Sequence, residues 1–273
     1  MSSTSIVAGH DALVTEMDDV EAHEVGRRDT GPLDTGLLDV VVLHAADAEA
    51  AQAGGADRLE VRGSPDDGGR SAEPATVSTV VRATDLPVRV VLRLSDGYTT
   101  TGGEAARLIG LASDYLAVGA EGVVLGFLDA NLELDLQVID ALVSPLRSAP
   151  WTLSRAVDSV LDADRAWRQL VGLPGLTAVH TAGSALGLDA GLDDLCRRAS
   201  SDPAVARLVL AGGGLRAEHV PWLVQSGVRQ LHLAEAVRPG GTFGRSYVDA
   251  GLVRSWRLLL DDSIGRRTGH ANS

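Results

Sequence analysis

The chain has 273 residues, 45% of them hydrophobic and 22% charged, which is enough apolar surface for one large domain or two small ones. Its formal net charge of −13 argues against general binding to nucleic acids or membrane surfaces, because both are polyanionic. The single cysteine, Cys196, excludes an intrachain disulfide and a thiolate metal cage, and the absence of lysine excludes Schiff-base chemistry and a Walker-A lysine.

The two ends of the chain differ in composition from its middle. Residues 1–36 are polar and acidic without a sustained apolar period, so we expect a disordered N-terminal extension. Residues 261–273 have the same character and predict a flexible C-terminal tail. No apolar run matches a secretory signal or a membrane span, and we therefore expect a cytoplasmic protein.

Between residues 37 and 260, short apolar runs alternate with helix-like segments. Val, Leu and Thr dominate the apolar runs, whose lengths suit buried parallel strands. The runs lie at residues 38–43, 58–62, 88–93, 122–128, 151–155, 176–180, 207–211 and 229–234. The helix-like segments between them include residues 45–53, 104–118, 135–146 and 188–199.

A weak internal repeat supports this order of elements. Gly55, Gly119 and Gly227 each follow a helix-like segment and precede an apolar run, where a glycine can end the helix in the left-handed conformation. Eight strands alternating with helices over about 220 residues predict an α/β fold, a single (β/α)8 TIM barrel. A doubly wound open sheet is the alternative, but residues 43–46 lack the glycine-rich fingerprint expected after its first strand.

In a barrel of this kind the active site lies at the carboxyl ends of the strands. That rule selects a set of polar and glycine residues before any function is considered. The set comprises His44, Glu60, Arg62, Arg93, Arg155, Asp158, His180, Thr181, Gly212–Gly214, His232 and Glu235.

Three charged residues of this set have both a structural and a functional interpretation. Arg93 and Arg155 end otherwise apolar strands, where each would form an ion pair at the rim or join a clamp for an oxyanion. Glu60 lies between apolar neighbours, so its carboxyl group must be paired or protonated. It is either part of a structural pair or a general acid or base, with Asp158 orienting Arg155.

The glycine run and the histidines are equally open to two interpretations. Gly212–Gly214 form either a tight turn or a seat for an anion, because glycines let successive N–H groups point at one ligand. His44, His180 and His232 could meet as a metal site, but each could equally point into the helical layer. Cys196 lies near an apolar helical stripe and is interpreted as a buried structural thiol.

Together, these motifs resemble the CutC family, which is associated with copper homeostasis. The likeness spans most of the chain from Leu38 to Ala234 and is specific only when its motifs are taken together. It is carried by QAGGADRLEV (52–61), PDDGG (65–69), Arg93, SRAVD (154–158), TAG (181–183) and LAGGGLRAEHV (210–220). The resemblance implies a TIM barrel and an association with copper, which makes copper the candidate cofactor without assigning it.

The chain also departs from the family's pattern. The cysteine that commonly ends the second strand is Arg62 here, and only one arginine of an Arg-Pro-Arg motif is kept, as Arg93. The histidine before Arg155 is replaced by Ser154. Because soft thiolates favour Cu(I), the lost cysteine positions predict that the chain does not bind Cu(I) tightly.

Site residues follow from the resemblance together with the strand-end rule. We expect catalytic roles for Glu60, Arg93, Arg155 and Asp158. We expect ligand contacts from Thr181, Gly183, Gly212, Gly213, Gly214 and His232. Glu60, Arg93 and Arg155 should then share one pocket, with the glycine run on its wall.

Three functions remain open for the chain. The first is a CutC-like protein of copper homeostasis with an undefined molecular activity. The second is a lyase or isomerase acting on a polar or anionic metabolite, such as a sugar or phosphate compound. The third is a degenerate barrel that binds a ligand without catalysis. All three imply a small-molecule or anion partner and are compatible with a homo-oligomer.

Overall fold

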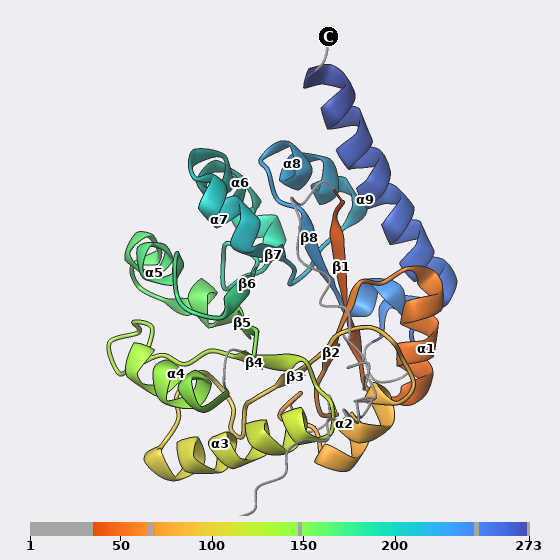
Figure 1. The fold of residues 1–273 in the computed structure, drawn as a ribbon. Coiled ribbons are helices and arrows are strands. Elements are labelled where there is room, and N and C mark those ends of the chain that lie inside the picture. The colour runs from red at the N-terminus through yellow and green to blue at the C-terminus, as the bar shows by residue number, and fades with distance from the viewer. Residues whose placement is uncertain (1–34, 65–67, 147–148, 243–245, 272–273) are drawn as a thin grey trace, which may run out of the picture. The chain divides into compact units, whose positions relative to one another are not determined.

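Eight parallel strands close into a barrel in the computed structural model, which describes residues 35–64, 68–146, 149–242 and 246–271 (Figure 1). Each strand pairs with its neighbours in sequence, and β8 pairs with β1. The strands are β1 (Leu37–Val42), β2 (Arg58–Val61), β3 (Val88–Val91), β4 (Gly122–Leu125), β5 (Trp151–Leu153), β6 (Leu176–Thr181), β7 (Val209–Ala211) and β8 (Gln230–Leu233). The predicted (β/α)8 barrel is confirmed, and its closure excludes the open sheet.

Helices surround the barrel (Figure 1). The α-helices of the described chain are α1 (Ala45–Gly54), α2 (Pro74–Val81), α3 (Gly102–Ala117), α4 (Leu136–Val143), α5 (Ala163–Leu170), α6 (Leu188–Ser201), α7 (Pro203–Leu208), α8 (Val220–Gln225) and α9 (Ala250–Ala271). Short 3-10 turns are η2 (Ser144–Leu146), η3 (Arg155–Ser159), η4 (Ala217–His219), η5 (Glu235–Val237) and η6 (Pro239–Gly241).

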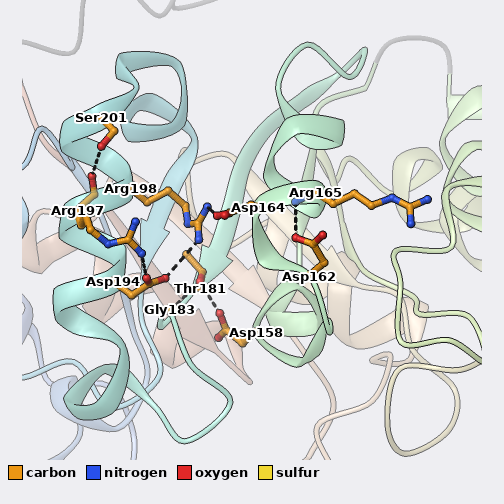
Figure 2. A network of polar contacts seen from close by, with 10 residues as sticks. All are labelled: Asp158, Asp162, Asp164, Arg165, Thr181, Gly183, Asp194, Arg197, Arg198 and Ser201. Carbon is orange, nitrogen blue, oxygen red and sulfur yellow. Dashed lines mark hydrogen bonds and ion pairs between the residues drawn. The ribbon is translucent and has the colours of Figure 1, made fainter.

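Local signals in the sequence account for several helix ends. α3 starts with a capping box, in which Thr101 Oγ1 accepts from the Glu104 N–H at 3.2 Å and Glu104 Oε2 accepts from the Thr101 N–H at 3.1 Å. α5 starts at Asp162, whose Oδ1 accepts from the Arg165 N–H at 2.8 Å (Figure 2). α1 ends at Gly55 with φ of 94°, the left-handed conformation predicted for this glycine.

On β2 the alternation of side chains separates residues of an outer apolar layer from charged residues inside the barrel. On β2, Leu59 and Val61 are fully buried in the apolar layer between the barrel and the helices. Arg58 and Glu60 have the opposite orientation and point into the barrel. Successive inward residues of one strand therefore lie at different depths, with Glu60 nearer the carboxyl end.

The amino-terminal part of the barrel interior holds paired polar groups. Arg58 Nε donates to Asp39 Oδ2 at 2.7 Å. Arg89 donates from Nη1 to Thr152 Oγ1 at 2.6 Å and forms an ion pair with Glu121. Burial lowers the pKa of Arg89 to about 10, although nearby carboxylates oppose that shift. This end of the barrel therefore shows pairing typical of a structural network.

Two expected boundaries need correction. The flexible tail expected from residue 261 is replaced by helix, because α9 runs to Ala271 and buries Ile264 against the barrel. The run at 207–211 starts too early, because Asp202 caps α7 and Pro203 begins it, so β7 starts only at Val209. The expected disordered extension over 1–36 lies outside the described residues except for its last two positions.

The described helices include none that is both long enough and apolar enough to span a bilayer.

Candidate functional site

The carboxyl ends of β2, β6 and β8 bring Glu60, His180 and His232 together inside the barrel mouth. His232 Nε2 lies 3.2 Å from Glu60 Oε2, and both side chains are at least 96% buried. The imidazole rings of His180 and His232 stack with their centroids 3.8 Å apart and 30° between their planes. One ligand atom from each of the three residues lies within 4.8 Å of the other two. The arrangement is a compact cluster of one carboxylate and two imidazoles.

The space for the two imidazoles comes from Gly212, just beyond β7 and between β6 and β8. A Cβ atom at Gly212 would lie 2.7 Å from His180 Nε2 and 2.9 Å from His232 Cβ. Both distances are shorter than van der Waals contact. Gly212 is therefore needed for the stacked pair, which is a different role from the ligand contact expected for it.

The electrostatic environment keeps Glu60 ionised and His180 neutral. Burial favours a raised pKa for Glu60, but the charge and contact of His232 and the charge of Arg62 outweigh it and hold the pKa well below its usual range. Burial, reinforced by the charge of His232, lowers the pKa of His180 well below its ordinary value. A carboxylate with so low a pKa is a weak base, so general-base chemistry by Glu60 gains no support here.

Arg62 and Arg93 flank this cluster. They lie in the segments that follow β2 and β3. Arg62 Nε lies 3.4 Å from Glu60 Oε1, on the opposite side of the carboxylate from His232. Arg93 is anchored through its backbone, whose N–H donates to Ser71 Oγ at 2.9 Å, and through its guanidinium, which donates to the Gly68 carbonyl. Among the described residues, its buried Nε has no hydrogen-bond partner and its guanidinium pairs with no carboxylate.

A third arginine, Arg155, is held by Asp158 and by the loop after β6. Arg155 Nε donates to Asp158 Oδ2 at 2.8 Å, and its Nη2 donates to the Ser184 carbonyl at 2.9 Å. Its Nη1 makes no hydrogen bond within the described ranges, and the side chain is 26% exposed. Arg155 therefore keeps one donor group available to a ligand.

Asp158 is itself fixed by β6 and the turn after it. Its Oδ1 accepts from the Thr181 hydroxyl (Figure 2), and its Oδ2 accepts from the Ala182 N–H at 2.9 Å. The same hydroxyl oxygen accepts from the Gly183 N–H at 2.9 Å. Thr181 and Gly183 line neither mouth cavity described below, so their connection to the site is indirect, through Asp158 and Arg155.

Two of the cavities at the mouth share Arg62, Arg155 and His180 as lining residues. The smaller, of about 150 Å³, is also lined by Glu60, Arg93 and Tyr98. The larger, of about 380 Å³, is also lined by His232, Gly213, Gly214 and Glu235. Glu60, Arg93 and Arg155 thus line one cavity together, whereas Gly213 and Gly214 line its neighbour. Their expected catalytic and binding roles remain proposals.

The glycine run after β7 lies against the arginine. A Cβ atom at Gly213 would come within 2.7 Å of Arg155 Nη1, so the guanidinium packs directly over this glycine. Gly213 and Gly214 have φ of 83° and 84°. Their N–H groups donate to no described residue, which leaves them open to a ligand in the larger cavity.

Other candidates lie away from the mouth cluster. His44 is exposed, and its ring packs edge-on against Tyr247 with centroids 5.8 Å apart, so it does not join His180 and His232. Cys196 lies on α6 and lines a separate cavity beside Trp222. Tyr98 in the smaller cavity was not anticipated, because nothing in the spacing of the sequence marks it.

The side chains at the mouth differ from the ligands that Cu(I) prefers. Cu(I) prefers thiolate or thioether ligands, whereas the cluster offers one carboxylate and two imidazoles. The chain's only cysteine lines a different cavity. The residues present therefore do not fit Cu(I), and their chemistry suits divalent ions instead.

Comparison with known proteins links the chain to one family. A family model described as CutC family matches residues 37–237. A CutC family protein of Klebsiella pneumoniae is 28% identical over 187 residues, which cover 68% of this chain and 74% of that protein. One from Bacteroides thetaiotaomicron is 29% identical over 227 residues, or 77% and 90% of the two chains. One from Xanthomonas axonopodis pv. citri is 30% identical over 188 residues, or 68% and 77%.

Solved structures agree on the fold. A crystal structure of CutC from Streptococcus agalactiae, which carries the description copper homeostasis protein, matches with a TM-score of 0.65 and 20% identity. The match covers 72% of this chain and 98% of that one. Dihydrodipicolinate synthase from Bacillus clausii matches with a TM-score of 0.58 and 13% identity, over 88% and 76% of the chains. At these identities the similarity concerns the barrel fold alone.

Proposed function

Since the chain belongs to the CutC family, we propose that the mouth of its barrel binds a small anionic metabolite and catalyses a lyase or isomerase step on it. The observation that supports this best is the set of guanidinium donors left without partners around the mouth. Arg155 Nη1 and Arg93 Nε belong to this set within the described chain, and both residues line the smaller cavity.

Charge counting favours an anionic ligand. Three arginines line the two cavities, Arg62, Arg93 and Arg155. The smaller cavity is lined by all three arginines and, among the described carboxylates, by Glu60 alone, whereas Asp189 and Glu235 also line the larger one. Guanidinium groups bind carboxylate and phosphate through paired N–H donors, so either group would satisfy them.

The reaction class is proposed by elimination, without an assigned acid or base. It has no lysine for a Schiff base and shows no nucleotide-binding motif, so group transfer to a nucleotide or an imine intermediate has no support. The low pKa of Glu60 suits a carboxylate that stays ionised and holds a neighbour, rather than one that removes a proton from carbon. We also propose that the protein is cytoplasmic and takes part in copper homeostasis, the process with which the family is associated.

Thermal unfolding of the full chain in phosphate, with EDTA present throughout, tests the anion site. Phosphate should raise the melting temperature of the wild type, because a ligand that binds only the folded state stabilises it by mass action. Arg155→Ala and Arg93→Ala should lose most of this increase. Arg82→Ala, at the exposed residue that caps the carboxyl end of α2, is the matched control and should keep it.

Chloride at the same ionic strength separates specific binding from general salt effects. Equal increases in the wild type, Arg155→Ala and Arg82→Ala would overturn the anion site. A normal increase combined with no turnover of any carboxylate or phosphate metabolite would favour the degenerate, non-catalytic barrel.

A further inference from the structure

We propose that Glu60, His180 and His232 form a binding site for a divalent transition-metal ion, such as Zn²⁺, at the barrel mouth. The three residues come from β2, β6 and β8, and one ligand atom from each lies within 4.8 Å of the others. The proposal goes beyond anion binding and rests only on these three side chains.

Such an ion would give a partner to the Nε2 atom of each imidazole. His180 Nε2 and His232 Nε2 are both buried, and neither has a hydrogen-bond partner among the described residues. A buried polar atom left without a partner is costly, so two in one cluster need an explanation. His232 Nε2 lies 3.2 Å from Glu60 Oε2, yet the pair lacks hydrogen-bond geometry.

That separation fits two atoms that bind a common ion. Zinc ligands about 2.1 Å from the metal lie about 3.4 Å apart in a tetrahedron. Ligand atoms within 4.8 Å of one another need only small side-chain movements to reach that spacing. The alternative, a hydrogen-bonded structural triad, would leave the His180 nitrogen without a role.

The surroundings of Glu60 support the same assignment. Arg62 Nε contacts Oε1 at 3.4 Å, so Oε2 is the oxygen that faces the imidazoles. Interactions of this kind orient a carboxylate ligand. Two nitrogens and one oxygen suit Zn²⁺, Fe²⁺ or Cu²⁺ but not Cu(I). Three protein ligands also leave a coordination position for water or a ligand oxygen.

Metal binding by the full chain, with any affinity tag removed, tests this proposal. The protein is stripped with EDTA, desalted into a phosphate-free buffer and titrated with Zn²⁺ in an isothermal calorimeter. We expect one Zn²⁺ per chain. His180→Ala, His232→Ala and Glu60→Gln should each weaken binding by more than about 100-fold, because losing a ligand should exceed the 10–100-fold effect of losing an outer partner. His44→Ala, at an exposed histidine outside the cluster, should bind like the wild type.

Co²⁺ provides a second measurement that does not depend on variants that fold poorly. Co²⁺ bound by imidazole nitrogens in a four- or five-coordinate site absorbs visible light strongly, so the wild type should show d–d bands that saturate at one equivalent. No stoichiometric Zn²⁺ binding, no saturable Co²⁺ bands, or equal binding by His180→Ala and His44→Ala would overturn the proposal. Because EDTA is present in the phosphate test and phosphate is absent here, each proposal can fail without the other.

Discussion

At the scale of single residues, Gly212 decides whether two histidines can occupy the barrel mouth together. It follows the short strand β7, and a Cβ atom there would lie within 3 Å of atoms from both His180 and His232. The absence of a side chain at Gly212 thus makes room for the stacked imidazoles, which lie in one cluster with Glu60.

Substituting Gly212 with alanine should therefore separate the histidines. We expect Gly212→Ala to destabilise the fold by about 1–3 kcal/mol through overcrowding, and to weaken Zn²⁺ binding without removing a ligand. Urea unfolding and Zn²⁺ calorimetry measure the two effects. The control is Gly110→Ala inside α3, where the new Cβ meets open space. It should be neutral or stabilise by about 0.5–1 kcal/mol, and equal behaviour of the two variants would contradict this role for Gly212.

Sequence reasoning located part of this site and missed its grouping. It selected Glu60, His180 and His232 individually, because each lies near the carboxyl end of an apolar run. It grouped the histidines with His44 instead of Glu60. The inward or outward orientation of a strand residue depends on strand register, which a run of apolar letters does not define. Only the closed barrel shows that Glu60 and the two histidines point inward.

At the scale of elements, a buried ion pair connects the segment after β8 with α1. Arg238 Nη2 donates to Asp47 Oδ2 at 3.0 Å, and both side chains are at least 99% buried. Asp47 also accepts from the N–H groups of Leu43 at 2.9 Å and Val248 at 2.8 Å. The Asp47 carboxylate on α1 therefore binds the residue that follows β1 and the segment that precedes α9.

Removing the charge of that carboxylate should be costly. We expect Asp47→Asn to destabilise the fold by about 3 kcal/mol or more, because a buried guanidinium loses its counter-charge. Asp262→Asn is the matched control, since the Asp262–Arg266 pair on α9 is exposed and should contribute far less to stability. Chemical denaturation of both variants measures the difference. A loss below about 1 kcal/mol for Asp47→Asn would contradict the role given to this pair.

The last helix contributes to the fold well past the boundary expected at Leu260. Ile264 is 7% exposed, whereas Leu258 on the same helix is 64% exposed. We expect Ile264→Ala to cost about 2–3 kcal/mol and Leu258→Ala less than about 0.5 kcal/mol, which thermal unfolding would measure. Equal losses would show that α9 does not pack through Ile264.

Element positions were more predictable than element ends. All eight strands were expected within a few residues of where they lie, because apolar runs of strand length mark buried parallel strands directly. The end of α9 was missed because polar residues dominate after Leu260, and a single buried Ile264 gives no periodic pattern. Packing against the barrel, which the local sequence does not show, extends this helix.

At the scale of the whole molecule, the two depths of the barrel interior differ in whether each arginine has a carboxylate partner among the described residues. Near the amino-terminal end, Arg58 pairs with Asp39, and Arg89 pairs with Glu121. At the mouth, Arg93 pairs with no described carboxylate, and Arg155 Nη1 makes no hydrogen bond within the described chain. The chain as a whole is strongly acidic, with a net charge of −13. An anion should therefore prefer the mouth to other parts of the surface.

A crystal structure of the full chain grown in selenate tests this anion-binding mouth most directly, because selenium identifies itself by anomalous scattering. We expect an anomalous peak within hydrogen-bond distance of Arg155 Nη1, on the side of the cavity that Arg93 also lines. Selenate on exposed arginines such as Arg82, with water alone beside Arg155, would contradict an anion site at the barrel mouth.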